Sequence, residues 1–385
     1  MQKVSMKMRL SRSIVGEAEA KAVSRVLLED GYLGMGNETR EFEADLAKFL
    51  EVEAEQVITV NSGTAALHLA CDAVRATAKE TQGQPEILVP SLTFVASFQA
   101  ITAAGCKPVA CDVLLETGTM DLEDAAKKIT PNTIGLMYVD YASNPWQLSS
   151  VYALAKEHQL RVIEDAAHAF GCRHHGARIG SFGDLVCFSF DGIKNITCGE
   201  GGCVVSFDAK SSELIKDARL LSVEGDTAKR FAGGRSWEAD VKRQGWRYHL
   251  SNIMAAIGRE QLKRFPKEFL PKRTLRAQVY GQRLCKQEGI ALFQVDPKDF
   301  IVPHIQVVRV LNGRKDYLRS ELEKKGIPTG VHYKPNHLHT FFGGGQESLP
   351  KAEQLFSEIL TLPLHPALSC QDVEEICAYI AKILD

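Results

Sequence analysis

The sequence predicts an α/β protein whose central sheet is largely parallel and covered by helices on both faces. Two observations carry this prediction. Short runs of β-branched or apolar residues recur between residues 57 and 207, and stretches with apolar residues at helical spacing lie between them. Strands that are joined through helices run parallel, and sheets of this kind are buried on both sides.

Seven strands are predicted from the apolar runs. They lie at residues 57–60, 87–89, 108–111, 134–139, 161–165, 185–190 and 203–207. Crossover helices are predicted at residues 65–80, after the first strand, and at residues 149–158, before the fifth. We therefore expect one mostly parallel sheet of seven strands.

The composition changes after a helical pattern at residues 250–265. Charged helical patterns follow it, around one further strand candidate at residues 305–310. We therefore place a domain boundary near residue 265. The prediction is a large domain with an N-terminal arm at residues 1–265 and a smaller C-terminal α+β domain at residues 266–385.

Composition and charge argue against several classes of protein. The 385 residues are 45% hydrophobic and 24% charged, which is ordinary for a globular protein. The net charge is −2 and no basic block is present, so we expect no nucleic-acid partner. The first ten residues lack a continuous apolar core, and no later apolar run is long enough to span a bilayer. We expect a cytoplasmic protein without membrane contact.

The ten cysteines predict neither disulfides nor a zinc site. No two of them form a C-x-x-C pair, and several lie inside apolar strand-like runs such as residues 185–190. A reduced thiol in such a run behaves as a small apolar side chain. The sequence therefore predicts no metal site.

The first predicted strand ends in a glycine turn that leads into a helix. Ser62, Gly63 and Thr64 form this turn. In parallel α/β sheets, ligands bind beyond the carboxyl ends of the strands, and the N–H groups at a helix start favour phosphate. The turn is therefore a candidate phosphate site, and a plain helix cap is an equally good interpretation at this stage.

Two other predicted strands also end in polar residues. Glu164 and Asp165 close the fifth strand, and an acid at that place can hold a metal, a ribose or a protonated ring nitrogen, or can be a buried structural acid. The sixth strand carries Ser189 and leads into a glycine-flanked loop with Lys194. A lysine in such a loop is most often a solvated surface charge.

The combination of these features favours a cofactor site over the simpler interpretations. Phe94 follows the second strand, so it joins Asp165, Lys194 and the phosphate-type turn at one edge of the sheet. Pyridoxal phosphate needs a lysine for its Schiff base, an acid for its ring nitrogen, a phosphate site and a flat partner for its ring. The sequence therefore predicts pyridoxal 5′-phosphate as cofactor.

The sequence resembles the DegT/DnrJ/StrS family of fold-type I, pyridoxal-phosphate-dependent nucleotide-sugar aminotransferases, nearly from end to end. The resemblance depends on an ordered series of segments, each weak alone. They lie at residues 31–43, 61–70, 90–97, 162–171, 183–202, 245–258, 330–342 and 362–366. The resemblance implies a fold-type I transferase whose large domain binds the cofactor.

The resemblance also implies roles for matching residues. Lys194 would form the Schiff base and act as the base that moves a proton in transamination, and Asp165 would pair with the ring nitrogen. Phe94 would stack on the ring. The phosphate would be held by Ser62, Gly63, Thr64 and Ser189. Some members of the family are dehydratases with histidine in place of this lysine, so the lysine here favours transamination.

Two positions depart from the family's usual pattern. His168 stands where glutamine is common, near the expected place of the ring's phenolic oxygen; it can donate a hydrogen bond there or be a core-facing polar residue. Arg247 stands where the family usually has an asparagine that reaches the cofactor phosphate of the neighbouring subunit. The arginine changes both the reach and the charge of that contact.

The resemblance places a further group of residues near the sugar. Tyr32 and Gly34 match an N-terminal loop near the substrate, and His332, Tyr333 and His337 match a second segment near it. For any single one of them, a packing or turn role is nearly as good an interpretation. Family members with a similar segment more often aminate carbon 4 than carbon 3 of the sugar.

These implications define the predicted activity. We expect a homodimer with active sites at the subunit interface that transfers an amino group from L-glutamate to a nucleotide-linked 4-keto-6-deoxy sugar, in the biosynthesis of surface polysaccharide or glycoconjugate sugars. A 3-keto-sugar aminotransferase, a cofactor-dependent sugar dehydratase and a non-catalytic sugar-binding relative are the alternatives. Loss of Lys194 or Asp165 would favour the last of these, and both are present.

Overall fold

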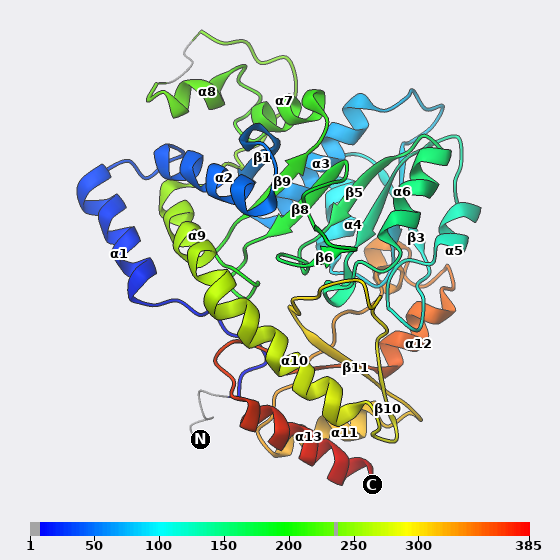
Figure 1. Ribbon diagram of the computed structural model, residues 1–385. Helices are drawn as coiled ribbons and strands as arrows, with labels where there is room; N and C mark the ends of the chain where they lie inside the picture. The colour runs from blue at the N-terminus through cyan, green and yellow to red at the C-terminus, as the bar shows by residue number, and fades with distance from the viewer. Residues whose placement is uncertain (1–7, 235–237) are drawn as a thin grey trace.

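The computed structural model describes residues 8–234 and 238–385. Its centre is a seven-stranded sheet with the order β1-β9-β8-β5-β4-β2-β3 (Figure 1). The neighbours from β8 through β5, β4 and β2 to β3 pair in parallel, whereas β9 runs antiparallel to both β1 and β8. The strands are β1 (Val57–Val60), β2 (Glu86–Pro90), β3 (Lys107–Cys111), β4 (Thr133–Val139), β5 (Arg161–Asp165), β8 (Leu185–Ser189) and β9 (Gly202–Ser206). The predicted mostly parallel sheet is confirmed.

Alternating side chains along the strands build a separate core on each face of the sheet. In β4, Met137 belongs to one core, while Leu136 and Tyr138 belong to the other. Helices α3 (Gly63–Thr77) and α4 (Val95–Ala103) cover the first face. The second face is covered by α2 (Asn37–Leu50), α6 (Leu148–Glu157) and α9 (Asn252–Arg264). Because both faces are buried, the site is confined to the edge where the strands end.

Shorter helices lie around the two cores. The N-terminal helix α1 (Glu17–Arg25) continues into a π-helical turn, Val26–Asp30, and packs against α9 (Figure 1). Helix α7 (Ala209–Ala218) adds Ile215 and Ala218 to the first core, α5 (Leu122–Lys127) adds Ala125 to the second, and α8 (Asp226–Phe231) contacts α7. The two-residue strands β6 (Arg173–His174) and β7 (Ala177–Arg178) form a small hairpin after β5.

The C-terminal part has its own antiparallel sheet, with the order β10-β11-β12. Its strands are β10 (Ile290–Leu292), β11 (Gln306–Val310) and β12 (Ile359–Leu362). The helices around it are α10 (Leu270–Leu284), α11 (Lys315–Lys324), α12 (Pro350–Glu358) and α13 (Cys370–Leu384). A third core lies between this sheet and α10, α11 and α13. The strand predicted at residues 305–310 is confirmed as β11.

A π-helical turn joins α9 directly to α10. This turn, Phe265–Phe269, leaves no non-helical residue between the two helices. The domain boundary predicted near residue 265 falls at this turn, and the division into two domains stays a prediction. Within the part of the chain that the structure describes, no helix is both long enough and apolar enough to span a membrane.

Candidate active site

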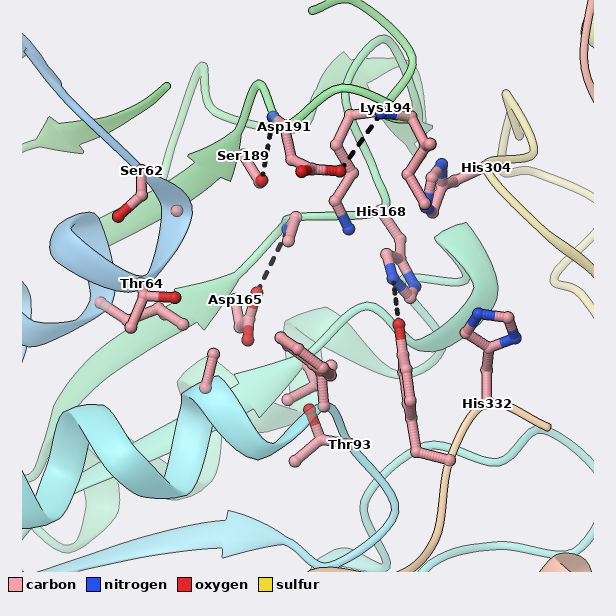
Figure 2. A pocket seen from close by; sticks show the side chains of 18 of the residues that line it. Ser62, Thr64, Thr93, Asp165, His168, Ser189, Asp191, Lys194, His304 and His332 are labelled. Carbon is pink, nitrogen blue, oxygen red and sulfur yellow. Dashed lines mark hydrogen bonds between the residues drawn. The ribbon is translucent and has the colours of Figure 1, made fainter. Parts of the chain in front are cut away.

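The carboxyl ends of several strands meet around one cavity. Strands β5 and β8 are parallel neighbours, and the pairing through β9 makes β1 parallel to them. A cavity of about 360 Å³ opens at this edge. Figure 2 shows side chains from several strand ends and loops directed towards it. The sequence-predicted residues among its lining are Ser62, Gly63, Thr64, Phe94, Asp165, His168, Ser189, Lys194, His332 and Tyr333.

Lys194 enters the cavity from the loop after β8. A turn holds its backbone, because the N–H of Lys194 donates to the carbonyl of Asp191 at 3.1 Å. Burial lowers the pKa of the Lys194 ammonium from 10.5 to about 8, against the opposing effect of the carboxylates of Asp165 and Asp191. Among the described acids, none lies within ion-pair distance of this ammonium. A lysine that loses its proton this readily suits a nucleophile or a base.

Asp165 ends β5 and is held in place by two hydrogen bonds. The Ser97 hydroxyl donates to Oδ2 at 2.8 Å, and the Ala167 N–H donates to Oδ1 at 3.2 Å. Burial raises the pKa of the Asp165 carboxyl, although these hydrogen bonds and the charge of Lys194 favour ionisation. A cationic partner in the cavity would oppose the cost of burial. The arrangement therefore suits a protonated ring nitrogen.

The glycine turn predicted from the sequence brings a helix start against two strands. Ser62 caps α3, because its hydroxyl accepts from the Ala65 N–H at 3.0 Å. A side chain at Gly63 would place its Cβ 2.7 Å from the Cβ of Ser189, and one at Gly202 would lie 2.7 Å from the Ser62 carbonyl oxygen. Only glycine permits this close approach. The first N–H groups of α3, the helix dipole and the hydroxyl of Ser189 together favour phosphate.

Two neighbouring histidines, whose ring planes are tilted by 42° to each other, and a tyrosine form one wall of the cavity. Nε2 of His168 lies 3.1 Å from the hydroxyl of Tyr333, and the rings of His168 and His304 are 4.6 Å apart (Figure 2). Burial lowers the pKa of both imidazoles well below their usual value. Burial and the nearby Lys194 also lower the pKa of His332, to about 4. These rings are therefore neutral near pH 7 and act as hydrogen-bond partners.

Phe94 lies at the mouth of the cavity. It precedes α4 and is 53% exposed, which is unusual for a side chain of this size. Its ring lies 5.4 Å from that of Tyr333, at an interplanar angle of 46°. An exposed aromatic face beside a cavity suits stacking on a flat ligand.

Sequence reasoning missed several lining residues, including Thr93, Asp191, Glu200 and His304. It also missed Ser97, which lies behind the cavity and orients Asp165. The strand candidate at residues 305–310 was a signal for His304, because this histidine directly precedes it. Nothing in the sequence pairs Ser97 with an acid 68 positions away.

The remaining predicted residues do not line the cavity. Tyr32 is 42% exposed at a second hollow beside Arg230, and its carbonyl accepts from Asn252 Nδ2 at 2.9 Å. Gly34 belongs to the same segment, and its carbonyl accepts from the Asn252 N–H at 3.0 Å. Arg247 is exposed and contacts Asn61 Nδ2 through its backbone carbonyl at 3.5 Å. The roles predicted for these residues stay predictions.

His337 is buried away from the cavity. Its Nδ1 lies 2.6 Å from the hydroxyl of Ser91, and its Nε2 lies 3.3 Å from Oε1 of Glu353. The neighbouring part of the same segment differs, since His332 and Tyr333 do reach the cavity. One short segment thus contributes both to the site and to the packing beneath it.

Comparison with known proteins identifies the family to which this site belongs. The profile of the DegT/DnrJ/EryC1/StrS aminotransferase family matches residues 13–381. The chain belongs to this family. It is 32% identical, over 98% of its length and 96% of the relative's, to the dTDP-4-dehydro-2,3,6-trideoxy-D-glucose 4-aminotransferase of Saccharopolyspora spinosa.

Solved structures of the family have the same fold. The aminotransferase TlmJ from Streptoalloteichus hindustanus superposes with a TM-score of 0.89 at 31% identity, covering 98% of this chain and 99% of TlmJ. The putative sugar aminotransferase Spr1654 from Streptococcus pneumoniae, solved in a PLP form, gives 0.88 at 25% identity, covering 98% of each chain. The predicted fold-type I family and fold are confirmed, and the chain is a sugar aminotransferase of this family.

Aminotransferases of this family use pyridoxal phosphate, and the cavity fits that cofactor. Gly63 leaves the space beside Ser189 that a Cβ would fill, and Gly202 leaves such a space beside Ser62, next to the start of α3. Asp165 supplies the buried acid and Phe94 supplies the exposed aromatic face. These groups therefore match a phosphate, a protonated ring nitrogen and a flat ring in one cavity, and the predicted cofactor is confirmed.

Proposed function

We propose that this enzyme transfers an amino group from L-glutamate to carbon 4 of a nucleotide-linked 4-keto-6-deoxy sugar. One observation carries the proposal: Lys194, Asp165 and the start of α3 converge on a single cavity. The family membership supports amino transfer to a sugar. The Saccharopolyspora spinosa relative is named for amination at carbon 4, which supports the position.

Each residue has a task that follows from its surroundings. Bound pyridoxal phosphate supplies an aldehyde that carries the amino group and a ring that draws electrons from the reacting carbon. Lys194, as a neutral amine, removes a proton from that carbon and returns it at the neighbouring position. Its pKa of about 8 allows both steps near neutral pH. The ionised Asp165, oriented by Ser97, keeps the ring nitrogen protonated.

The wall of the cavity orients the reacting groups. Tyr333 and His168 hold one another through their hydrogen bond, so the hydroxyl and the imidazole face the cavity in fixed positions. His332 lies beside them, and its Nδ1 is tied to the hydroxyl of Thr361 at 2.8 Å. We assign the sugar to the space in front of His332 and Tyr333, in line with the role that the family resemblance implies.

The proposed enzyme is a homodimer in which the neighbouring subunit completes the site. Tyr32 and Arg247 support this, because both are exposed and neither lines the cavity of its own subunit. The family resemblance assigns the position of Arg247 to the phosphate of the neighbouring site. A guanidinium offers a planar pair of donors that suits a phosphate.

The test is product analysis with defined substrates. The holoenzyme is incubated with glutamate and a panel of nucleotide-linked 3-keto and 4-keto deoxy sugars, and each product is identified by NMR. We expect an amino group at carbon 4 together with one equivalent of 2-oxoglutarate. Amination at carbon 3 would favour the 3-keto alternative. Loss of a hydroxyl without gain of nitrogen would indicate a dehydratase, and sugar binding without any turnover would indicate a non-catalytic relative.

A further inference from the structure

A buried arginine lies behind the loop that carries Lys194. Arg273 belongs to the first turn of α10, and only 2% of it is exposed. Its side chain does not line the cavity of the active site. The chemistry proposed above therefore does not use it.

The guanidinium of Arg273 connects two segments of the active site. Nη1 donates to the carbonyl oxygens of Pro303 and His304 at 3.3 and 3.1 Å. Nη2 donates to those of Ile193 and Lys194 at 3.5 Å each. The arginine thus joins the loop of Lys194 to the segment of His304.

The charge of Arg273 has no carboxylate partner among residues 8–234 and 238–385. Burial lowers the pKa of its guanidinium to about 10, and no neighbouring acid opposes this effect. At that value the group keeps its proton near pH 7. Its Nε is also buried without a hydrogen-bond partner. A buried charge of this kind is costly and an apolar side chain would avoid the cost, so packing alone does not explain the arginine.

The charged neighbours of Lys194 act on its pKa in opposite directions. Asp165 and Asp191 favour the ammonium, whereas Arg273 favours the neutral amine. The other titratable groups around the amine are imidazoles and phenols that burial keeps neutral near pH 7, and one further acid. They are His168, His304, His332, Tyr141, Tyr333 and Glu200. Arg273 is therefore a fixed positive charge that counteracts the two aspartates.

We propose that Arg273 is a further positioning residue of the active site, which ties down the loop of Lys194 and favours its neutral amine through a positive charge without a carboxylate partner. The inference rests on the proposed function, because that function requires Lys194 as nucleophile and base. Arginine suits both tasks. Its planar guanidinium reaches acceptors on two segments, and it keeps its charge where a buried lysine would lose it.

The size of the effect follows from the neutral fraction of Lys194. With a pKa of about 8, about one tenth of the amine is neutral at pH 7. Each further unit of pKa would reduce this reactive fraction about tenfold. Even a modest contribution from Arg273 is therefore measurable.

The experiment measures the protonation of Lys194 in the full-length apoprotein, without turnover. Trace amounts of acetic anhydride react with neutral amines, so acetylation of Lys194 follows its neutral fraction. Mass spectrometry quantifies the label from about pH 6 to about pH 11, with the exposed Lys210 as internal reference. In the parent, acetylation should level off above a midpoint of about pH 8. In Arg273→Gln, which keeps an amide donor for the carbonyls, the midpoint should rise by about half a unit to one unit.

The matched control is Arg276→Gln, on the same helix. Arg276 also donates to backbone carbonyls, those of Leu368 and Lys272, at 2.8 and 3.0 Å. It is not among the charges that affect Lys194, so this variant should have the midpoint of the parent. Circular dichroism establishes that each variant is folded. If Arg273→Gln does not fold, Arg273→Lys takes its place, because its buried ammonium loses its charge and the midpoint of Lys194 should again rise.

Equal midpoints in the Arg273 variant and in Arg276→Gln would overturn the inference. The result is separate from the product analysis. A raised midpoint without amination at carbon 4 would support the effect of Arg273 on Lys194 and contradict the proposed function. Amination at carbon 4 with an unchanged midpoint would support the proposed function and remove Arg273 from it.

Discussion

The residues that line the cavity and the exposed segment around Arg247 differ in how far the sequence predicts where their side chains lie. Residues expected to bind the cofactor core, such as Asp165, Ser189 and Lys194, meet within one subunit. Tyr32 and Arg247, expected to act near the sugar or the phosphate, lie outside that cavity and are exposed. The first group is placed by the chain's own sheet. The contact of the second group with a partner subunit stays a proposal.

The difference has a simple geometric cause. In a parallel sheet the strand ends share one edge, so residues at those ends converge without any knowledge of loop structure. Asp165 and Ser189 end neighbouring strands, and Ser62 follows a third strand of the same direction. Tyr32 and Arg247 lie on segments outside the strands of the sheet, so no strand end places their side chains at the cavity.

The largest expected effect is that of Lys194→Ala. This change removes the group that links to the cofactor and moves the proton, so turnover should fall by more than about 10³-fold. The yellow absorbance of covalently attached cofactor should disappear as well. Lys210→Ala, at an exposed lysine on α7, is the matched control and should retain both properties. Normal transamination by the Lys194→Ala enzyme would show that the base lies elsewhere.

The second prediction uses the lowered pKa of Lys194. Only the neutral amine attacks the cofactor aldehyde, so the rate at which apoprotein captures pyridoxal phosphate should follow the neutral fraction. With a pKa of about 8, the rate should rise about tenfold per pH unit up to pH 8 and then level off.

Three charged groups, in addition to burial, affect the pKa of Lys194. Asp165 and Asp191 raise its pKa, and Arg273 lowers it. Stopped-flow absorbance measures the capture rate, with Lys194→Ala as the baseline. A rate that keeps rising towards pH 10.5 would mean that the amine is as basic as a solvated lysine, and that the cavity does not tune it.

Much of the fold was predictable because the apolar pattern is strong. All seven strands of the sheet were expected, and each observed end lies within one residue of the predicted one, as in β2 and β8. The antiparallel direction of β9 was not specified in advance, because a single apolar run does not encode its direction. The join between α9 and α10 through a π-helical turn was also not anticipated.

The candidate site was predictable where single residues end strands, and not where distant segments meet. Lys194 and Asp165 follow directly from their places in the chain. Ser97 and His304 do not, since Ser97 acts through its hydrogen bond to Asp165 and His304 through the contact of its ring with that of His168. Contacts of this kind depend on how side chains of different elements pack together. The spacing of residues along the sequence does not predict that packing.

The third prediction tests the partner surface. Replacing Arg247 by alanine should weaken pyridoxal phosphate binding by about tenfold to hundredfold, the equivalent of one charge-assisted hydrogen bond of roughly 1.5–3 kcal/mol. Arg247→Asn, the usual family residue, should retain more of the affinity than Arg247→Ala. Equilibrium titration with the cofactor provides the measurement, and unchanged affinity in the alanine variant would remove Arg247 from the site.

Mixed dimers distinguish a contact within a subunit from one between subunits. One chain carries Arg247→Ala and the other carries Lys194→Ala. If Arg247 serves its neighbour, one site combines both lesions and the other has neither, so about half of wild-type activity per dimer returns. If Arg247 serves its own subunit, every site remains impaired. Among the described residues it has no ion pair with an acid that would suggest a purely local role.

The smallest expected effect on turnover is that of His337→Ala, and it separates two histidines of the same segment. His337 is buried against Ser91 and Glu353, whereas His332 lines the cavity. Removing the His337 imidazole takes away the closer partner of the Ser91 hydroxyl, which then keeps only the backbone N–H of residue 337, so the free energy of unfolding should fall by about 1–3 kcal/mol. Because His337 does not reach the cavity, kcat/KM of the folded enzyme should change by less than about twofold. His332→Ala should show the opposite pattern, with a lower kcat/KM and little loss of stability. Chemical denaturation and steady-state kinetics on both variants provide the measurements. A large loss of kcat/KM without loss of stability in His337→Ala would restore the substrate role that the family resemblance implies, and would move His337 from the packing beneath the cavity to the site itself.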